Sequence, residues 1–353
     1  MTWLTYRLFR AQAAAGLGAL AIAAILATIT GPHLAQLYDI SVATCRAHGD
    51  CPAARSALLR SDHLLQSGFG TLLGVTPFLI GIFWGAPLVA RELETGTFRL
   101  AWTQSVTRTR WLTLKLGIVG LASMAVAGLL SLTVTWWSGP FDSVNNNPFN
   151  SFDQRGIAPI GYAALGFALG VTAGMLIRRT LPAMAAALAA LAGARVAVTA
   201  LRPHLFAALR LTIPDKEIVA SGPSSPTAGV LDPRDWVLSD QTVNASGHVI
   251  GQGGTLFPNG PQGINVGPKG VDIIGVGSCP NINVPSVHGR PGPLTHGNAL
   301  IQRCVDQLRI REVLIYQPAS RYWAFQWYET AIFIAAAITL AGFCFWWVRH
   351  RLS

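Results

Sequence analysis

Six runs of about 20 mostly apolar residues divide this sequence, and they constrain its fold more than any other feature. A helix needs about 20 such residues to cross the ~30 Å of hydrocarbon in a bilayer. The composition agrees, because only 12% of the 353 residues are charged, whereas soluble domains average about 25%. We therefore predict a mainly α, polytopic membrane protein with six transmembrane helices, at residues 13–37, 67–89, 115–138, 157–177, 181–201 and 326–348.

The charges predict which side of the membrane each connecting segment faces. With the N-terminus in the cytosol, the inside segments and Lys115 at the membrane edge hold 11 of the 26 Lys and Arg residues but only two of the 16 Asp and Glu residues. Basic loops remain on the cytoplasmic side of multi-pass proteins. We expect a cell-membrane protein with both termini cytoplasmic and no nucleic-acid partner, because no soluble basic patch remains. The inside segments are 1–12, 90–114, 178–180 and 349–353, and the outside segments are 38–66, 139–156 and 202–325.

The cysteines agree with this topology. Four of the five lie in outside segments, where disulfides persist. The spacing suits a local Cys45–Cys51 bridge and a second bridge between Cys279 and Cys304, and the alternative is four unrelated buried thiols. Cys344 falls within the last span and is expected to be free.

The long outside segment, residues 202–325, predicts a small α/β extracytoplasmic domain between the fifth and sixth spans. Its first half is rich in Gly, Pro, Asn and Ser, which favours turns. Short β-branched runs at Trp236–Leu238 and Val271–Val276 predict strands, and the apolar spacing of residues 298–308 predicts a helix. The chain is thus divided into residues 1–201, 202–325 and 326–353, and nothing in the middle part indicates a ligand.

The sequence lacks the motifs of the common catalytic and metal sites. A nucleotide-binding P-loop requires a Gly-Lys pair, and none of the three lysines follows a glycine. There is no H-E-x-x-H, Cys-x-x-Cys or G-x-S-x-G motif, and the histidines are scattered. We expect no catalytic residues, no metal site and no cofactor in this chain.

Two further patterns concern the spans themselves. Gly166, Gly170 and Gly174 recur every four residues in the fourth span and predict a face on which a helix of this subunit or of a second copy packs closely, although 36 glycines make a chance run the alternative. Arg195 and Glu329 lie about 9 and 5 Å inside the outer ends of adjacent spans, at ~1.5 Å per residue. Charges at such depth usually face a partner, so we predict an ion pair that gates or braces the outer side. The alternative is that each reaches the headgroups alone.

The stretch RELETGTFRLAWTQSVTRTRW, residues 91–111, carries the most specific resemblance. Together with TWLTYRLFRAQ near the N-terminus and the run FNSFDQRGIAPIGYAALGFALGVTAGMLIRRTLPAMAAAL, it resembles the ABC type-2 exporter permeases. That resemblance implies a permease without enzymatic activity of its own, a separate ABC ATPase subunit, a second, identical permease copy, and outward transport of a hydrophobic or amphipathic, drug-like small molecule. The outer segment is longer than in many such permeases, which leaves the substrate class open.

The resemblance also implies that the loop 90–114 forms a coupling helix that docks on the ATPase. The residues permit this, because Gly96 can end the preceding helix, Thr97 can begin a new one, and Thr107 or Thr109 can cap the third span. The predicted partner-interface residues are Glu92, Glu94, Phe98, Arg99, Trp102, Thr103 and Gln104. The alternative is a basic stop-transfer loop with interfacial aromatic residues.

Two other functions are alternatives to the permease. A membrane-anchored ligand-binding or sensor protein would use the outer domain and would not co-purify with an ATPase. A membrane-embedded enzyme would need paired acids, histidines or activated serines inside the spans, and these spans contain few such residues. The presence or absence of an ATPase partner therefore distinguishes the permease from the ligand-binding or sensor protein.

Overall fold

The computed structural model describes residues 2–43, 63–96, 107–144, 147–213, 231–252, 264–267, 270–273, 277–279, 286–287, 290–291 and 307–351. These residues form two compact units. Unit 1 comprises residues 1–202 and 322–353, and unit 2 comprises residues 203–321.

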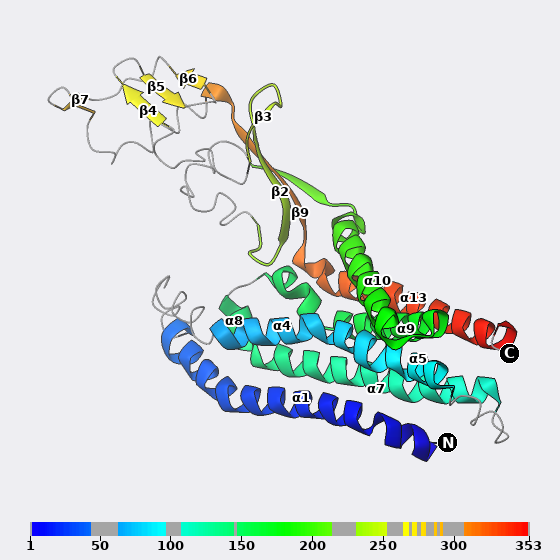
Figure 1. The fold of residues 1–353 in the computed structure, drawn as a ribbon. Helices are drawn as coiled ribbons and strands as arrows, with labels where there is room; N and C mark the ends of the chain where they lie inside the picture. The colour runs from blue at the N-terminus through cyan, green and yellow to red at the C-terminus, as the bar shows by residue number, and fades with distance from the viewer. Residues whose placement is uncertain are drawn as a thin grey trace. The chain divides into compact units, whose positions relative to one another are not determined.

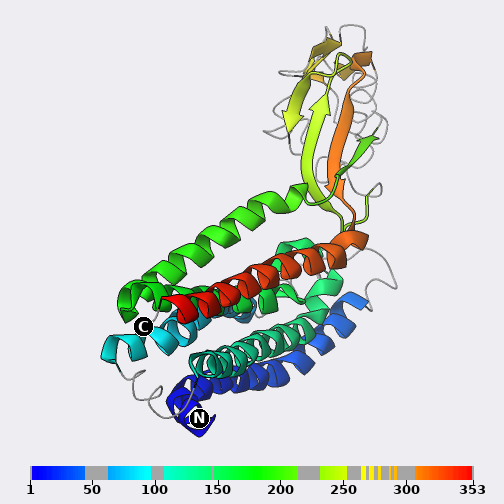
Figure 2. The same ribbon diagram turned by 90° about the vertical axis from the view of Figure 1, so that its right-hand side faces the viewer.

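Unit 1 is a helical bundle (Figures 1 and 2). Six of its helical segments are long and apolar enough to cross a membrane, which confirms the predicted number of spans. They are Ala13–Ile40, Leu64–Thr95, Thr109–Trp137, Pro148–Ile177, Thr180–His204 and Ala319–His350. The helices that build them are α1 (Thr2–Leu37), η1 (Tyr38–Ala43), α4 (His63–Leu79), η2 (Ile80–Gly85), α5 (Ala86–Thr95), α7 (Arg108–Trp137), η3 (Pro148–Gln154), α9 (Ala158–Ile177), α10 (Thr180–Leu201), η4 (Arg202–His204), η7 (Ala319–Arg321) and α13 (Tyr322–His350). The short helix α8 (Gly139–Val144) lies between the third and fourth spans in the sequence.

The helix α9 forms the centre of the bundle. It contacts α4, η2, α5, α7, α10 and α13, and most of its side chains are buried. A helix that is apolar on every face, as α9 is, has to be covered on all sides. By contrast, α1 packs mainly along α7 at the outside of the bundle (Figure 1), and many of its apolar side chains are exposed.

The predicted glycine face of α9 packs against the second span of the same chain. A Cβ atom added at Gly166 would lie 2.5 Å from the carbonyl oxygen of Pro77, and one at Gly174 would lie 2.6 Å from that of Ala86. One at Gly170 would collide with the backbone of η2. Real Cβ atoms do not approach so closely, so only glycine permits this backbone-to-backbone packing. We call this contact the glycine seam.

The segment η2 is a π-helix within the second span. It begins three residues after Pro77, whose ring removes one backbone hydrogen bond from α4. Its own glycines, Gly81 and Gly85, face α9, because a Cβ atom at either position would lie within 3 Å of an α9 carbonyl oxygen. The π turn thus rotates two glycines into the seam and other side chains away from it.

Unit 2 contains the predicted small sheets. The order β1-β9-β2-β3 forms a four-stranded antiparallel sheet, β4-β5-β6 a three-stranded one, and β7 and β8 a pair. The strands are β1 (Leu209–Ile213), β2 (Trp236–Val243), β3 (Val249–Gln252), β4 (Ile264–Gly267), β5 (Gly270–Ile273), β6 (Gly277–Cys279), β7 (Ser286–Val287), β8 (Arg290–Pro291) and β9 (Arg311–Gln317). Most of the helix predicted at residues 298–308 lies outside the described residues.

Two carboxyl side chains lie on the same side of the four-stranded sheet of unit 2. Glu312 on β9 lies opposite Thr242 on β2, so Asp240, two residues earlier on β2, faces the same side of the sheet. Glu312 is only 1% exposed, and no described group donates a hydrogen bond to its carboxylate oxygens. Burial, and after it the hydrogen bond with Asp240, raises the pKa of Glu312 to about 8.

Two of the cysteine predictions can be compared with the structure. Cys279 is disulfide-bonded, and Cys344 is free and buried in α13. Cys304, the predicted partner of Cys279, lies outside the described residues, as do Cys45 and Cys51.

Candidate functional site

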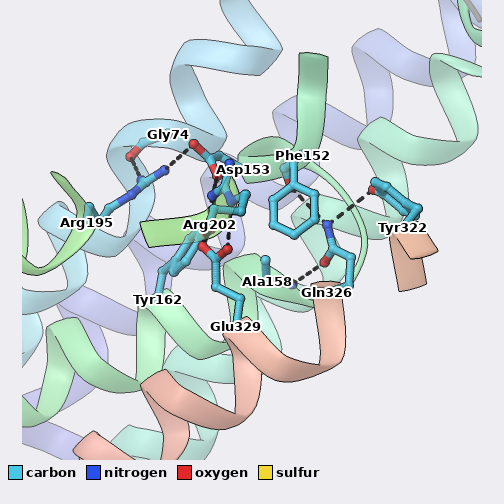
Figure 3. Close-up of polar contacts among 10 residues, drawn as sticks. All are labelled: Gly74, Phe152, Asp153, Ala158, Tyr162, Arg195, Arg202, Tyr322, Gln326 and Glu329. Atoms are coloured by element: carbon cyan, nitrogen blue, oxygen red, sulfur yellow. Dashed lines mark hydrogen bonds and ion pairs between the residues drawn. The ribbon is translucent and has the colours of Figure 1, made fainter. Parts of the chain in front are cut away.

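A network of charged side chains lies where α10 finishes and α13 begins, which we call the domain end of unit 1 (Figure 3). Arg202, directly after α10, donates two hydrogen bonds to Glu329 of α13, from Nε at 2.8 Å and from Nη2 at 2.9 Å. Its Nη2 also pairs with Asp153 of η3. Arg202 and Glu329 are 6% and 1% exposed. This two-point arrangement is the strongest geometry that an arginine and a carboxylate adopt.

Tyr162 and Arg195 extend the network towards the second span. The Tyr162 hydroxyl lies 2.5 Å from Glu329 Oε1 and 3.1 Å from Asp153 Oδ1, and it can donate its single proton to one of them at a time. Arg195 Nη2 lies 3.4 Å from Asp153 Oδ2, and its Nη1 donates to the carbonyl oxygen of Gly74 at 3.2 Å. The Arg195 guanidinium also lies over the Tyr162 ring, 4.4 Å from its centre.

These contacts correct one prediction. Arg195 and Glu329 do not form a direct pair, because Arg202 occupies Glu329 and Arg195 binds Asp153 and Gly74. Both residues do belong to one network, in which Asp153 lies between the two arginines. Two arginines and two carboxylates balance each other, so this buried cluster carries no net charge, which reduces the cost of burying it.

Sequence reasoning missed Arg202 and Asp153 because both fell in segments assigned to the outside. A signal was present. Arg202 follows Arg195 by seven residues, which is two helical turns, so a helix continued past residue 201 places both guanidinium groups on one face.

Gln326 joins the same region of α13 to the start of α9. Its Oε1 accepts hydrogen bonds from the backbone N–H groups of Ile157 at 3.1 Å and Ala158 at 2.9 Å, and its Nε2 donates to the carbonyl oxygen of Phe152 at 3.0 Å. The first N–H groups of a helix have no partner within the helix. Gln326 and Glu329 are three residues apart and therefore face the same side of α13, so one face of that helix holds both the cap and the ion pairs.

The opposite end of unit 1, where α5 ends and α7 and α10 begin, is the loop end. Gly96 has φ = 72° and ends α5, and the side chain of Thr107 accepts a hydrogen bond from the N–H of Arg110 at the start of α7. Both boundaries agree with the sequence prediction. Five of the predicted partner-interface residues lie between them, outside the described residues: Phe98, Arg99, Trp102, Thr103 and Gln104.

The other two predicted interface residues, Glu92 and Glu94, make contacts within the chain. Glu92 lies 2.5 Å from Lys115 Nζ of α7, which also donates to the carbonyl oxygen of Leu88 at 3.1 Å. Glu94 accepts hydrogen bonds from the N–H and the hydroxyl of Thr180 at 3.1 and 2.7 Å. An anionic group at a helix N-terminus is favourable because it interacts with free N–H groups. The end of α5 is therefore fastened to both α7 and α10.

The described residues contain no group of three or more His, Cys, Asp or Glu side chains arranged to hold a metal ion. The domain-end network is made instead of mutually compensating ion pairs and helix caps. Such contacts hold helices in one arrangement and can be exchanged for others when helices move.

Comparison with known proteins identifies the family. A family model described as "ABC-2 membrane transporter related" matches residues 17–202, which is more than half of the chain. No curated protein matches the chain, and no solved structure matches it. The matched region covers most of the first and fifth spans and all of the second, third and fourth, together with the glycine seam, the loop end, and Asp153, Arg195 and Arg202 of the network. The chain has six apolar helices that are long enough to span a membrane, and the family model covers more than half of it. It is therefore a multi-pass membrane protein of the ABC-2 transporter-related family.

Proposed function

We propose that this chain is the permease subunit of an ATP-driven exporter that moves a hydrophobic or amphipathic, drug-like small molecule outward. A separate ABC ATPase supplies the energy, and a second, identical permease copy completes the membrane part. The loop end faces the cytosol together with both termini, in the cell membrane. Family membership supports the transporter role, and the geometry of the loop end supports the coupling to an ATPase.

The observation that carries this proposal is that the helix ends on both sides of residues 97–106 are fixed to the bundle. On one side of it, α5 ends at Gly96 and binds α10 through Glu94. On the other side, α7 begins at Arg108, directly after its capping residue Thr107, and binds α5 through Lys115 and Glu92. A push from an ATPase bound to residues 97–106 would reach three spans at once, because the two flanking helix ends are joined to each other and to α10.

The test is co-purification of the detergent-solubilised protein, with mass spectrometry of what accompanies it, followed by ATPase assays in liposomes. We expect an ABC ATPase to co-purify and its hydrolysis to be stimulated by the permease. Phe98→Ala, Trp102→Ala and Arg99→Glu should each abolish stimulation and transport while the protein still inserts. Thr113→Val, which removes an exposed hydroxyl that bonds only within α7, serves as the matched control and should behave as wild type. Full stimulation in all three loop variants would contradict the coupling role.

The domain-end network fits an outer gate or a brace between the fifth and sixth spans. It joins α10 to α13 through Arg202 and Glu329, and those two helices flank unit 2 in the sequence. We propose that these ion pairs hold the outer ends of the two spans together in the state described here. Transport would then require the pairs to separate or to move as one body.

A ligand-binding or sensor function remains the second candidate, because residues 203–321 form a compact unit of their own. It predicts that no ATPase accompanies the purified protein and that deletion of unit 2 abolishes the response while the spans still insert. Finding an ATPase in the preparation would decide in favour of the permease.

A further inference from the structure

An apolar cavity of about 400 Å³ lies between α1, the second span and α7. Its walls include Gly16 and Ala19 of α1, Phe83 and Trp84 of η2, and Val126 and Leu130 of α7. This volume lies within the ~300–1,000 Å³ that is typical of small-molecule sites. All of these residues belong to segments that are apolar enough to span a membrane, so the cavity lies among the spans of unit 1.

The π-helical segment η2 gives the cavity its shape. Its two glycines face α9 in the glycine seam, and its large side chains Ile80, Phe83 and Trp84 line the cavity instead. π turns occur mostly as single-turn bulges inside α-helices and are frequent at functional sites. On the facing wall, Gly16 leaves room for the Trp84 ring, since a Cβ atom there would lie 2.8 Å from that ring.

The chemistry of the lining defines the ligand. None of the described residues that line the cavity is charged, and the hydroxyl of Thr76 already donates to the carbonyl oxygen of Leu72 at 2.7 Å. A charged or strongly polar group would therefore lose its hydration without gaining a partner. The aromatic side chains Phe83 and Trp84 favour a planar ring, because aromatic pairs gain energy beyond the area that they bury. Phe83 is 53% exposed, so this wall can be reached from outside the bundle.

We propose that this cavity binds the uncharged aromatic part of a hydrophobic small molecule that enters from the membrane. The inference rests on the proposed exporter function and specifies its substrate class as neutral, ring-containing and apolar. The ring lies in the cavity against Phe83 and Trp84, and any polar part of the molecule remains at the open side of the cavity.

The experiment is photolabelling of the full-length protein in phosphatidylcholine nanodiscs with a neutral phenyl-diazirine probe, followed by peptide mapping. We expect labelling of residues 79–84 that an excess of the unreactive phenyl analogue suppresses. Ala19→Phe, which fills the cavity, should weaken this competable labelling about tenfold, a loss of one decade in affinity. Ala15→Phe at a more exposed lining position should act in the same direction if Ala19→Phe does not fold. Ala24→Phe, at an exposed position of α1 outside the lining, is the matched control and should label as wild type.

Three results would overturn the inference. The first is labelling that the analogue does not suppress or that Ala19→Phe and Ala24→Phe affect equally. The second is efficient labelling only by a phosphatidylcholine with a diazirine in its acyl chain, which would make the cavity a lipid site. The third is that a second copy of the chain covers the cavity and prevents labelling of residues 79–84. Cross-links between the α1 helices of two copies would reveal this. Co-purification of an ATPase is measured in the same preparation. Absence of an ATPase would contradict the exporter function, whereas labelling of Ala19→Phe at the wild-type level would contradict the cavity proposal.

Discussion

Two glutamates, one in each unit, are equally buried but are neutralised in different ways. Glu329 in the bundle and Glu312 in unit 2 are both 1% exposed. Glu329 is held by the guanidinium of Arg202, whereas Glu312 faces a second acid, Asp240, and no described cation pairs with it. A buried carboxylate must either pair with a positive charge or take up a proton. The bundle pairs its glutamate with a positive charge and the sheet protonates its own, so the stability of the sheet should depend on pH near neutrality.

The largest effect is expected from removing the acid of the ion-paired site. Glu329→Ala leaves Arg202 buried with Asp153 as its remaining carboxylate partner. Breaking a buried ion pair in this way lowers the free energy of unfolding by about 3–5 kcal/mol. Thermal unfolding in nanodiscs measures the loss. Thr330→Val is the matched control, since it removes a neighbouring buried hydroxyl that has no hydrogen-bonding partner among the described residues, and it should leave stability unchanged or raise it. Equal losses in the two variants would show that the network contributes little.

Double-mutant cycles separate the contacts within the network. Arg202 and Glu329 should show a coupling energy of about 0.5–3 kcal/mol, because they are hydrogen-bonded, and Arg195 and Glu329 should show much less, because Asp153 and Arg202 lie between them. The exchange Arg195→Glu with Glu329→Arg is therefore expected not to restore transport or stability. Recovery in that double variant would reinstate the direct pair that the sequence predicted.

The pH dependence of unit 2 tests the proton-neutralised site. The pKa of Glu312 rises from 4.5 to about 8 on folding, so between these values the folded state holds a proton that the unfolded state has lost. The free energy of unfolding of unit 2 should then fall as the pH rises through this window. Glu312→Gln keeps the size of the side chain and a donor towards Asp240. The unfolding temperature of this variant should therefore depend less on pH, by a few degrees across the window. Arg234, exposed beside Asp232, offers a control in Arg234→Gln, whose pH slope should match wild type.

The smallest effect on stability is expected at a third acid, the exposed Glu94 at the loop end. Water replaces the hydrogen bonds to Thr180 when Glu94→Ala removes them, so the unfolding temperature should change little. Hydrogen exchange should nevertheless become faster in the first turn of α10, because the N–H of Thr180 loses its acceptor. Unchanged exchange there would show that Glu94 does not hold α10.

The sequence predicted the features that depend on local patterns. Hydropathy identified all six spans, and Gly96 and Thr107 marked the ends of the helices around the loop. Pairings between distant segments were not accessible in this way. The sequence placed Asp153 in an outside loop and Arg202 in the outer domain, because an apolar run ends where the first charged residue appears. In the structure the helices continue beyond that residue, and ion pairs compensate the charges.

The burial of Glu312 was also beyond reach of the sequence, since it follows from the register of β2 on β9. A shift by one residue would turn Glu312 to the other face of the sheet and separate it from Asp240. The π turn of η2 is a similar case, because only the structure shows that Gly81 and Gly85 face α9 while Trp84 turns away.

The glycine seam has a consequence for how the bundle can move. Where two backbones touch, there are no rotamers to exchange and no side-chain layer that can slide, so the second and fourth spans behave as a single stiff block. The fifth span differs, because only Ala183, Ala187 and Leu191 of α10 are buried. A rocking motion of this permease would therefore divide the bundle between the block and α10, with its pivots at the two ends where charged side chains hold that helix.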